Sequence, residues 1–96
     1  MGLDILAFGA HPDDVELGCS GTISKAVLEG KKVGIIDLTS GEMATRGTVD
    51  KREKEAQASA ELLGVKFREN MNFKDAFIFN DEIHQRKLIS VIRRYM

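Results

Sequence analysis

The sequence predicts an α/β fold with an open sheet of parallel strands and elements in the order β-α-β-α-β-α. Short apolar runs alternate with longer segments of helical periodicity, and the connections between them are short. Glycine follows each of the first two helical segments, as is usual at helix ends. Strands that alternate with helices in this way pair in parallel through right-handed crossovers.

The first half of the chain is predicted to form two buried strands and one helix. Residues 3–10 are short and almost continuously apolar, which is typical of a strand buried on both faces. Residues 15–29 form a helix that Gly30 ends, and 33–38 form the second strand, followed by the polar loop 39–48. The apolar stripe of this helix consists of Val15, Cys19, Ile23, Ala26 and Val27.

The second half is predicted to contain two helices around a less apolar strand. Thr48 can cap a helix over 49–63, which Gly64 ends. Val65 and Phe67 alternate with charged residues, so we expect a less buried strand at a sheet edge, followed by irregular structure over 70–80. Asp81 can cap a final helix whose inward residues are Ile83, Leu88, Val91, Ile92 and Tyr95.

The strand connections predict how the helices cover the sheet. If the strands are added in one direction, right-handed crossovers place both connecting helices on one face. The other face then exposes an apolar patch on the order of a few hundred Å², unless the last helix folds back across it. The chain therefore resembles half of a larger unit. One hypothesis is a non-catalytic α/β module that self-associates, and we expect a homo-oligomer.

Composition excludes several classes of partner. The 96 residues, 43% apolar and 30% charged, predict a single small domain over 1–96. A net charge of −1 provides no basic field for nucleic acid, and no apolar stretch reaches the about 18 residues of a membrane span. A single cysteine excludes an internal disulfide and, without a secretory leader pattern, we expect a cytoplasmic protein. A dinucleotide site is disfavoured because the first loop lacks the Gly-X-Gly-X-X-Gly spacing.

The strongest candidate site follows the first strand. His11 and Asp14 are three residues apart around Pro12, so both side chains can point to one spot, and imidazole with carboxylate suits zinc or another divalent metal. Asp13 projects differently and could act as general base on a metal-activated water. In the alternative interpretation, Asp13 or Asp14 caps the helix and His11 is an ordinary loop histidine. The position at a strand end leaves the two interpretations about equal.

The motif AHPDDVELG at 10–18, followed by GTI at 21–23, resembles the LmbE-like or PIG-L family of zinc-dependent N-acetylglucosaminyl deacetylases. In detail, the chain is similar to the branch that deacetylates N-acetylglucosaminyl malate in bacillithiol biosynthesis. The resemblance covers essentially the whole chain. Its further matching segments are 30–35 (GKKVGI), 37–42 (DLTSGE), 52–56 (REKEA) and 63–65 (LGV).

The resemblance implies a Rossmann-like sheet and metal-dependent hydrolysis of an N-acetyl group on a glucosamine conjugate, with zinc-activated water attacking the acetamide. It implies His11 and Asp14 as zinc ligands and Asp13 as general base. Arg52 matches an arginine of the substrate pocket, with a solvated charge as the alternative. Gly41 would let the second loop approach the sugar, with a plain turn glycine as the alternative.

The chain also departs from the family pattern. Family enzymes are more than twice as long, and their third zinc ligand is a downstream histidine that these 96 residues lack. We expect His84 to be a surface histidine of the last helix and no substitute for that ligand. With two protein ligands, zinc should bind weakly, so an inactive truncated fragment is the alternative to an active deacetylase.

Overall fold

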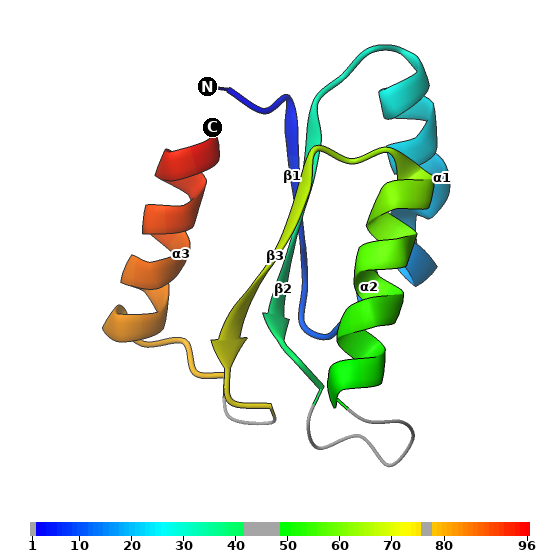
Figure 1. Cartoon of the computed structure of the whole chain (residues 1–96). Helices are drawn as coiled ribbons and strands as arrows, with labels where there is room; N and C mark the ends of the chain where they lie inside the picture. Colours follow the sequence, from blue (N-terminus) through cyan, green and yellow to red (C-terminus); the bar gives the residue numbers. More distant parts are fainter. Residues whose placement is uncertain (1, 42–48, 76–77) are drawn as a thin grey trace.

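The computed structural model describes residues 2–41, 49–75 and 78–96, and it confirms the predicted order of elements (Figure 1). The elements are β1 (Ile5–Gly9), α1 (Asp14–Leu28), β2 (Val33–Thr39), α2 (Val49–Leu63), β3 (Phe67–Phe73) and α3 (Glu82–Tyr95).

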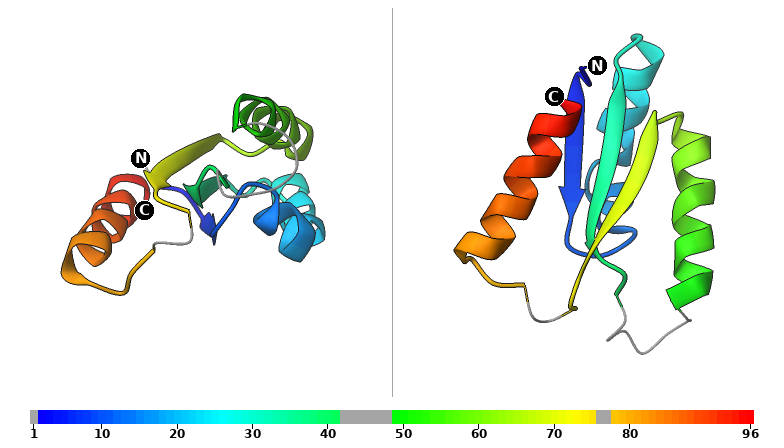
Figure 2. Two further views of the ribbon diagram at one scale, coloured as in Figure 1. Left: turned by 90° about the horizontal axis from the view of Figure 1, so that it is seen from below. Right: turned by 60° about the vertical axis from the view of Figure 1, so that its left-hand side comes forward.

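The three strands form one parallel sheet in the order β1-β2-β3. Ile5 of β1 is opposite Val33 of β2, and Gly34 of β2 is opposite Phe67 of β3. Because the strands are added in one direction, α1 and α2 lie on the same side of the sheet, while α3 lies on the other side (Figures 1 and 2). The prediction that both crossover helices share a face is confirmed.

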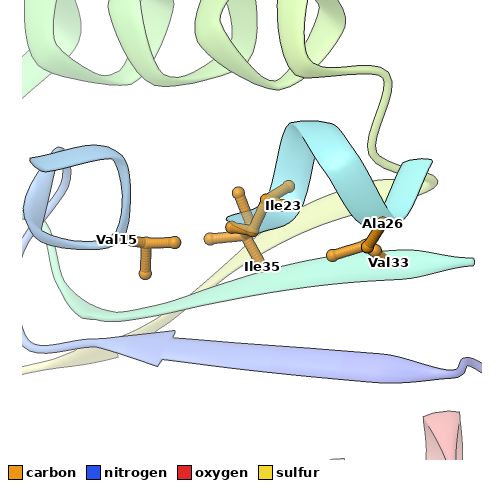
Figure 3. Packing of buried hydrophobic residues seen from close by; sticks show 5 residues of the cluster. All are labelled: Val15, Ile23, Ala26, Val33 and Ile35. Atoms are coloured by element: carbon orange, nitrogen blue, oxygen red, sulfur yellow. The ribbon is translucent and has the colours of Figure 1, made fainter. Parts of the chain in front are cut away.

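The main core lies between α1 and β2 (Figure 3). The predicted stripe of α1 faces it, with Cys19 and Val27 packed partly buried at its border. Burial of such aliphatic side chains is worth about 1.5–3 kcal/mol each, which fixes α1 on the sheet. The buried residues of this cluster are Val15, Ile23, Ala26, Val33 and Ile35.

The helix ends follow their local sequence. Gly30 and Gly64 adopt positive φ angles of 85° and 74°, the left-handed conformation that glycine adopts without strain. Asp81 caps α3 as predicted, because its Oδ1 accepts a hydrogen bond from the His84 amide at 2.9 Å. The proposed cap Thr48 lies outside the described residues.

The third strand differs from the prediction. It starts at Phe67 and continues to Phe73, through residues expected to be irregular. Arg68, expected on an exposed edge, is buried at 9% exposure. The polar residues continue the strand because their side chains find partners in it: the Asn70 side-chain amide donates to the Thr39 carbonyl at 3.0 Å. The position of β3 at a sheet edge is as predicted.

The last helix covers part of the second sheet face. Tyr95 stacks on Phe67 with ring centroids 4.0 Å apart, and its hydroxyl donates to Glu69 at 2.7 Å. Val91 is buried, but Ile83 and Ile92 are 66% and 42% exposed, so the predicted inward position of these two residues is wrong. The first turn of α3 instead packs His84 edge-on against Phe73, and this histidine is half-buried, in contrast to the expected surface position. Within the described chain, no helix has the length and apolar character needed to cross a bilayer.

Candidate functional site

The residues that directly follow the three strands lie at one edge of the sheet, because the carboxyl ends of parallel strands share an edge. The Ala10 carbonyl, just after β1, accepts hydrogen bonds from the Thr39 amide at 3.1 Å and from its hydroxyl at 2.9 Å. The first two loops are therefore joined where the predicted site residues lie.

His11 and Asp14 converge as their spacing predicted. The His11 amide donates to Asp14 Oδ2 at 3.0 Å, and the Asp14 amide donates to the His11 carbonyl at 3.2 Å. The ring nitrogen His11 Nδ1 lies 3.4 Å from Asp14 Oδ2, and both side chains are less than half exposed. Local backbone bonds thus hold an imidazole nitrogen and a carboxylate oxygen side by side.

This spacing fits two ligands of one metal ion. Neighbouring ligand atoms of a tetrahedral zinc lie about 3.3 Å apart, given metal–ligand distances of about 2.0–2.1 Å. The separation of 3.4 Å between His11 Nδ1 and Asp14 Oδ2 is close to that value. Among residues 2–41, 49–75 and 78–96, no group of three or more His, Cys, Asp or Glu side chains is arranged to hold a metal ion. This part of the chain therefore offers a ligand pair.

Asp75 is a site residue that the sequence did not reveal. Its Oδ1 lies 2.5 Å from His11 Nε2, although 64 positions separate the two residues, and Asp75 is only 5% exposed. The hydrogen bond with Asp75 is the main cause that raises the pKa of His11 above 6.5, against the opposing effect of burial, with the charges of Asp75 and Asp14 adding to it. The only sequence feature that could have indicated Asp75 is its position as an acidic residue just after the third strand.

Asp13 occupies the N-cap position of α1 with a left-handed backbone, φ 77°. Its side chain makes no capping hydrogen bond, so the alternative that Asp13 caps the helix is wrong. Asp13 is exposed and lines a pocket of about 230 Å³ between the first loop and α2. The other residues that line this pocket are Pro12, Glu16, Arg52, Glu55, Ala56 and Ser59.

Gly41 and Arg52 lie next to each other. A Cβ atom built on Gly41 would lie 3.0 Å from Arg52 Nη1 and 3.8 Å from Pro12 Cδ. Gly41 also has a positive φ of 67°, so both its backbone and its surroundings favour glycine. Arg52 is half-buried and lines the same pocket as Asp13. Gly41 and Arg52, which the resemblance assigned to substrate binding, are thus neighbours. Asp13, the expected base, lines the same pocket as Arg52.

Arg68, Asp37 and Glu16 form a buried charge cluster at the first turn of α1, which also carries one of the candidate metal ligands. Arg68 donates from Nε and Nη2 to Asp37 at 2.7 and 2.9 Å, and from Nη1 and Nη2 to Glu16 at 2.8 and 3.1 Å. Burial alone would raise the pKa of Glu16, but the hydrogen bonds and charge of Arg68 lower it overall. The hydrogen bonds of the two carboxylates likewise raise the pKa of Arg68 despite its burial. The cluster connects β3, β2 and the first turn of α1.

Comparison with known proteins places this geometry in a family. The family described as PIG-L: GlcNAc-PI de-N-acetylase matches residues 6–96. The uncharacterized deacetylase YaiS of Escherichia coli K12 is 37% identical over 71 residues, which cover 74% of this chain and 38% of YaiS. The diacetylchitobiose deacetylase of Thermococcus kodakarensis is 34% identical, covering 94% of this chain and 36% of that enzyme. The chain thus spans less than two fifths of these curated relatives.

A solved structure agrees with this assignment. The crystal structure of a conserved protein from Thermus thermophilus has a TM-score of 0.91 and 44% sequence identity, and the match covers 96% of this chain and 42% of that one. The fold and the sequence therefore lead to the same conclusion: the chain belongs to the PIG-L (GlcNAc-PI de-N-acetylase) family.

Proposed function

We propose that this chain provides the metal-binding and base-bearing part of a hydrolase that removes acetyl from an N-acetylglucosamine conjugate. The observation that supports it most is the 3.4 Å approach of His11 Nδ1 and Asp14 Oδ2 beside an exposed Asp13. Family membership and the similarity to a protein named diacetylchitobiose deacetylase favour an N-acetylated amino sugar as substrate. N-acetylglucosaminyl malate, the bacillithiol precursor, is the specific substrate that we propose.

His11 and Asp14 would hold zinc or another divalent metal, which when bound polarises the amide carbonyl and acidifies water. Asp13 takes the proton of the attacking water as its oxygen bonds to the carbonyl carbon, and delivers it to the nitrogen as the carbon–nitrogen bond breaks. The products are acetate and the free amine. The freedom of the Asp13 carboxylate from helix capping suits it for this transfer.

Arg52 and Gly41 would contact the sugar conjugate. A planar guanidinium offers several donors to sugar hydroxyls or to a malate carboxylate. Arg52 lines the 230 Å³ pocket together with Asp13, which supports a role for this pocket in binding the substrate beside the proposed base. A Cβ atom at position 41 would lie 3.0 Å from Arg52 Nη1, so glycine leaves room for the guanidinium in its present position.

We also propose that residues 1–96 form part of one deacetylase domain. A catalytic zinc takes three protein ligands and an open position, and the described residues offer the pair His11 and Asp14. The third ligand would then come from outside these residues. This expectation agrees with a chain that covers about two fifths of its structural relative.

The decisive experiment uses the longest protein that contains this chain and measures amine release from N-acetylglucosaminyl malate. We expect Asp13→Ala to lower the rate by about 10²–10⁴-fold while bound zinc, measured by mass spectrometry, is unchanged. Glu61→Gln, an exposed acid of α2, is the control and should retain full activity. Normal turnover in Asp13→Ala would refute the base assignment, and no turnover of any N-acetylated amino sugar by the unaltered protein would refute the function.

Self-association is a separate proposal that rests on exposed apolar side chains. Phe8 of the edge strand β1 is 37% exposed, and Ile89 and Ile92 of α3 are 48% and 42% exposed. We expect light scattering to show a homo-oligomer at micromolar concentration, since pairing of two copies would cover such side chains. A monomer throughout the concentration range would contradict this proposal and leave the deacetylase proposal intact.

A further inference from the structure

We propose that Asp75 is a positioning residue for the metal site: it accepts a hydrogen bond from Nε2–H of His11 and thereby leaves Nδ1, which faces Asp14, without a proton and able to bind the metal. This inference rests on the proposed roles of His11 and Asp14 as ligands. None of the motifs that pointed to the site includes Asp75, which the fold brings in from the end of β3.

The chemistry of the ring explains why a carboxylate is suited to this task. A neutral imidazole carries one N–H, and whichever nitrogen keeps the proton cannot bind a metal. An ionised carboxylate only accepts hydrogen bonds, so an ionised Asp75, with Oδ1 at 2.5 Å, favours the tautomer that carries the proton on Nε2. The lone pair is then on Nδ1, the nitrogen 3.4 Å from Asp14 Oδ2. A carboxylate behind a ligating histidine also raises the basicity of the ligand.

The burial of the pair distinguishes this contact from an ordinary surface pair. The side chain of Asp75 is 7% exposed, whereas that of His11 is 42% exposed. The anchoring carboxylate is thus inside the protein and the ring extends from it toward solvent. Since the pair joins the loops after β1 and β3, the orientation of the ring depends on the assembled sheet rather than on the first loop alone.

The chain contains a second carboxylate–imidazole pair that serves as a matched control. Asp81 Oδ1 lies 2.6 Å from His84 Nδ1, but the two residues are three apart in one helix turn and the Asp81 side chain is 45% exposed. Asp81→Asn retains a good N-cap residue, so α3 should be preserved. The substitution removes a carboxylate from a histidine without touching the proposed metal ligands.

The test measures the zinc affinity of the longest protein that contains this chain, so that a third ligand outside the described residues is included, by competition of Zn²⁺ with a chromogenic chelator. We expect Asp75→Asn to weaken zinc binding by about 10–100-fold, because the amide can donate to Nε2 and shift the proton to Nδ1. Asp75→Glu should recover part of the loss, and Asp81→Asn should bind zinc like the unaltered protein. Unchanged affinity in Asp75→Asn, or no zinc binding by the unaltered protein, would overturn the inference.

A second measurement needs no variant, and therefore holds even if Asp75→Asn does not fold. Two-bond ¹H–¹⁵N spectra distinguish which ring nitrogen of His11 carries the proton. We expect the Nε2–H form in the metal-free chain at pH above the histidine titration, and a zinc-induced shift at Nδ1. A proton on Nδ1, or zinc on Nε2, contradicts the inference.

The two proposals fail in different ways. Zinc affinity that depends on Asp75, in a protein that releases no amine from any N-acetylated amino sugar, refutes the deacetylase function and leaves the role of Asp75 standing. Amine release by the unaltered protein, together with full zinc binding in Asp75→Asn, refutes the role of Asp75 and leaves the deacetylase function standing.

Discussion

Arg68 and Asp37 form an ion pair with two hydrogen bonds in the interior of the protein, Nε to Oδ2 at 2.7 Å and Nη2 to Oδ1 at 2.9 Å. Their side chains are 1% and 3% exposed. Burying an arginine and an aspartate costs several kcal/mol per ion unless each finds a well-placed partner. Glu16 adds a second carboxylate at 2.8 Å, so the guanidinium connects the sheet to the helix that follows the candidate metal ligands.

Breaking this pair should strongly destabilise the chain. Arg68→Met leaves Asp37 buried without its cation, and we expect the free energy of unfolding in urea to fall by about 3–5 kcal/mol. The control is Arg86→Gln, which breaks a pair with Glu82 whose side chains are 78% and 73% exposed. That substitution should cost less than about 1 kcal/mol. Equal losses in the two variants would show that Arg68 contributes no more than a surface charge.

Stability should fall in acid because of Glu16. Its pKa in the folded chain is below the ordinary 4.5: burial would raise it, but Arg68 lowers it more. The folded state therefore binds fewer protons than the unfolded one, so the stabilisation is complete above pH 4.5 and is lost as pH falls through the folded pKa. Urea unfolding at decreasing pH measures this slope. Glu16→Gln should show a shallower slope, and an unchanged slope would contradict the prediction.

Gly41→Ala should affect both stability and sugar binding. A residue with Cβ at φ 67° costs about 1–2 kcal/mol, and the new methyl would lie 3.0 Å from Arg52 Nη1. Gly30→Ala is the control, since its φ is 85° but no atom lies within 4 Å of the added carbon. Both variants should lose similar stability in urea. Only Gly41→Ala should weaken the binding of N-acetylglucosamine, measured by NMR titration. Equal binding by Gly41→Ala and Gly30→Ala would show that Gly41 is not part of the sugar site.

Gly34→Ala should disrupt the contact between β2 and its neighbours. A Cβ there would lie 2.5 Å from Phe67 Cε1 and 2.8 Å from Leu3 Cδ1. Overpacking of this kind costs about 1–3 kcal/mol, which thermal or urea unfolding can measure. Gly21→Ala in α1 meets no atom within 4 Å and should be neutral or stabilising by up to about 1 kcal/mol. A neutral Gly34→Ala would mean that the Phe67 ring moves away without cost.

The sequence alone predicted the elements because their signals are local. Apolar runs and helical stripes define β1, α1, β2 and α2 to within one or two residues, and glycine ends α1 and α2. The pairing of His11 with Asp14 could be predicted for the same reason, since three residues in one turn determine their approach. The shared face of α1 and α2 followed from the handedness of crossovers.

The tertiary structure decided what the charged residues of β3 do. The alternation of Arg68 with apolar residues is the same sequence pattern whether the arginine lies on an exposed edge or in a buried ion pair. The pattern cannot distinguish the two because the partners Asp37 and Glu16 lie 31 and 52 positions away. The same holds for Asp75, which meets His11 only after three strands have aligned their ends. Sequence periodicity reports the environment averaged over a face, whereas the position of a single buried charge depends on partners that only the fold brings together.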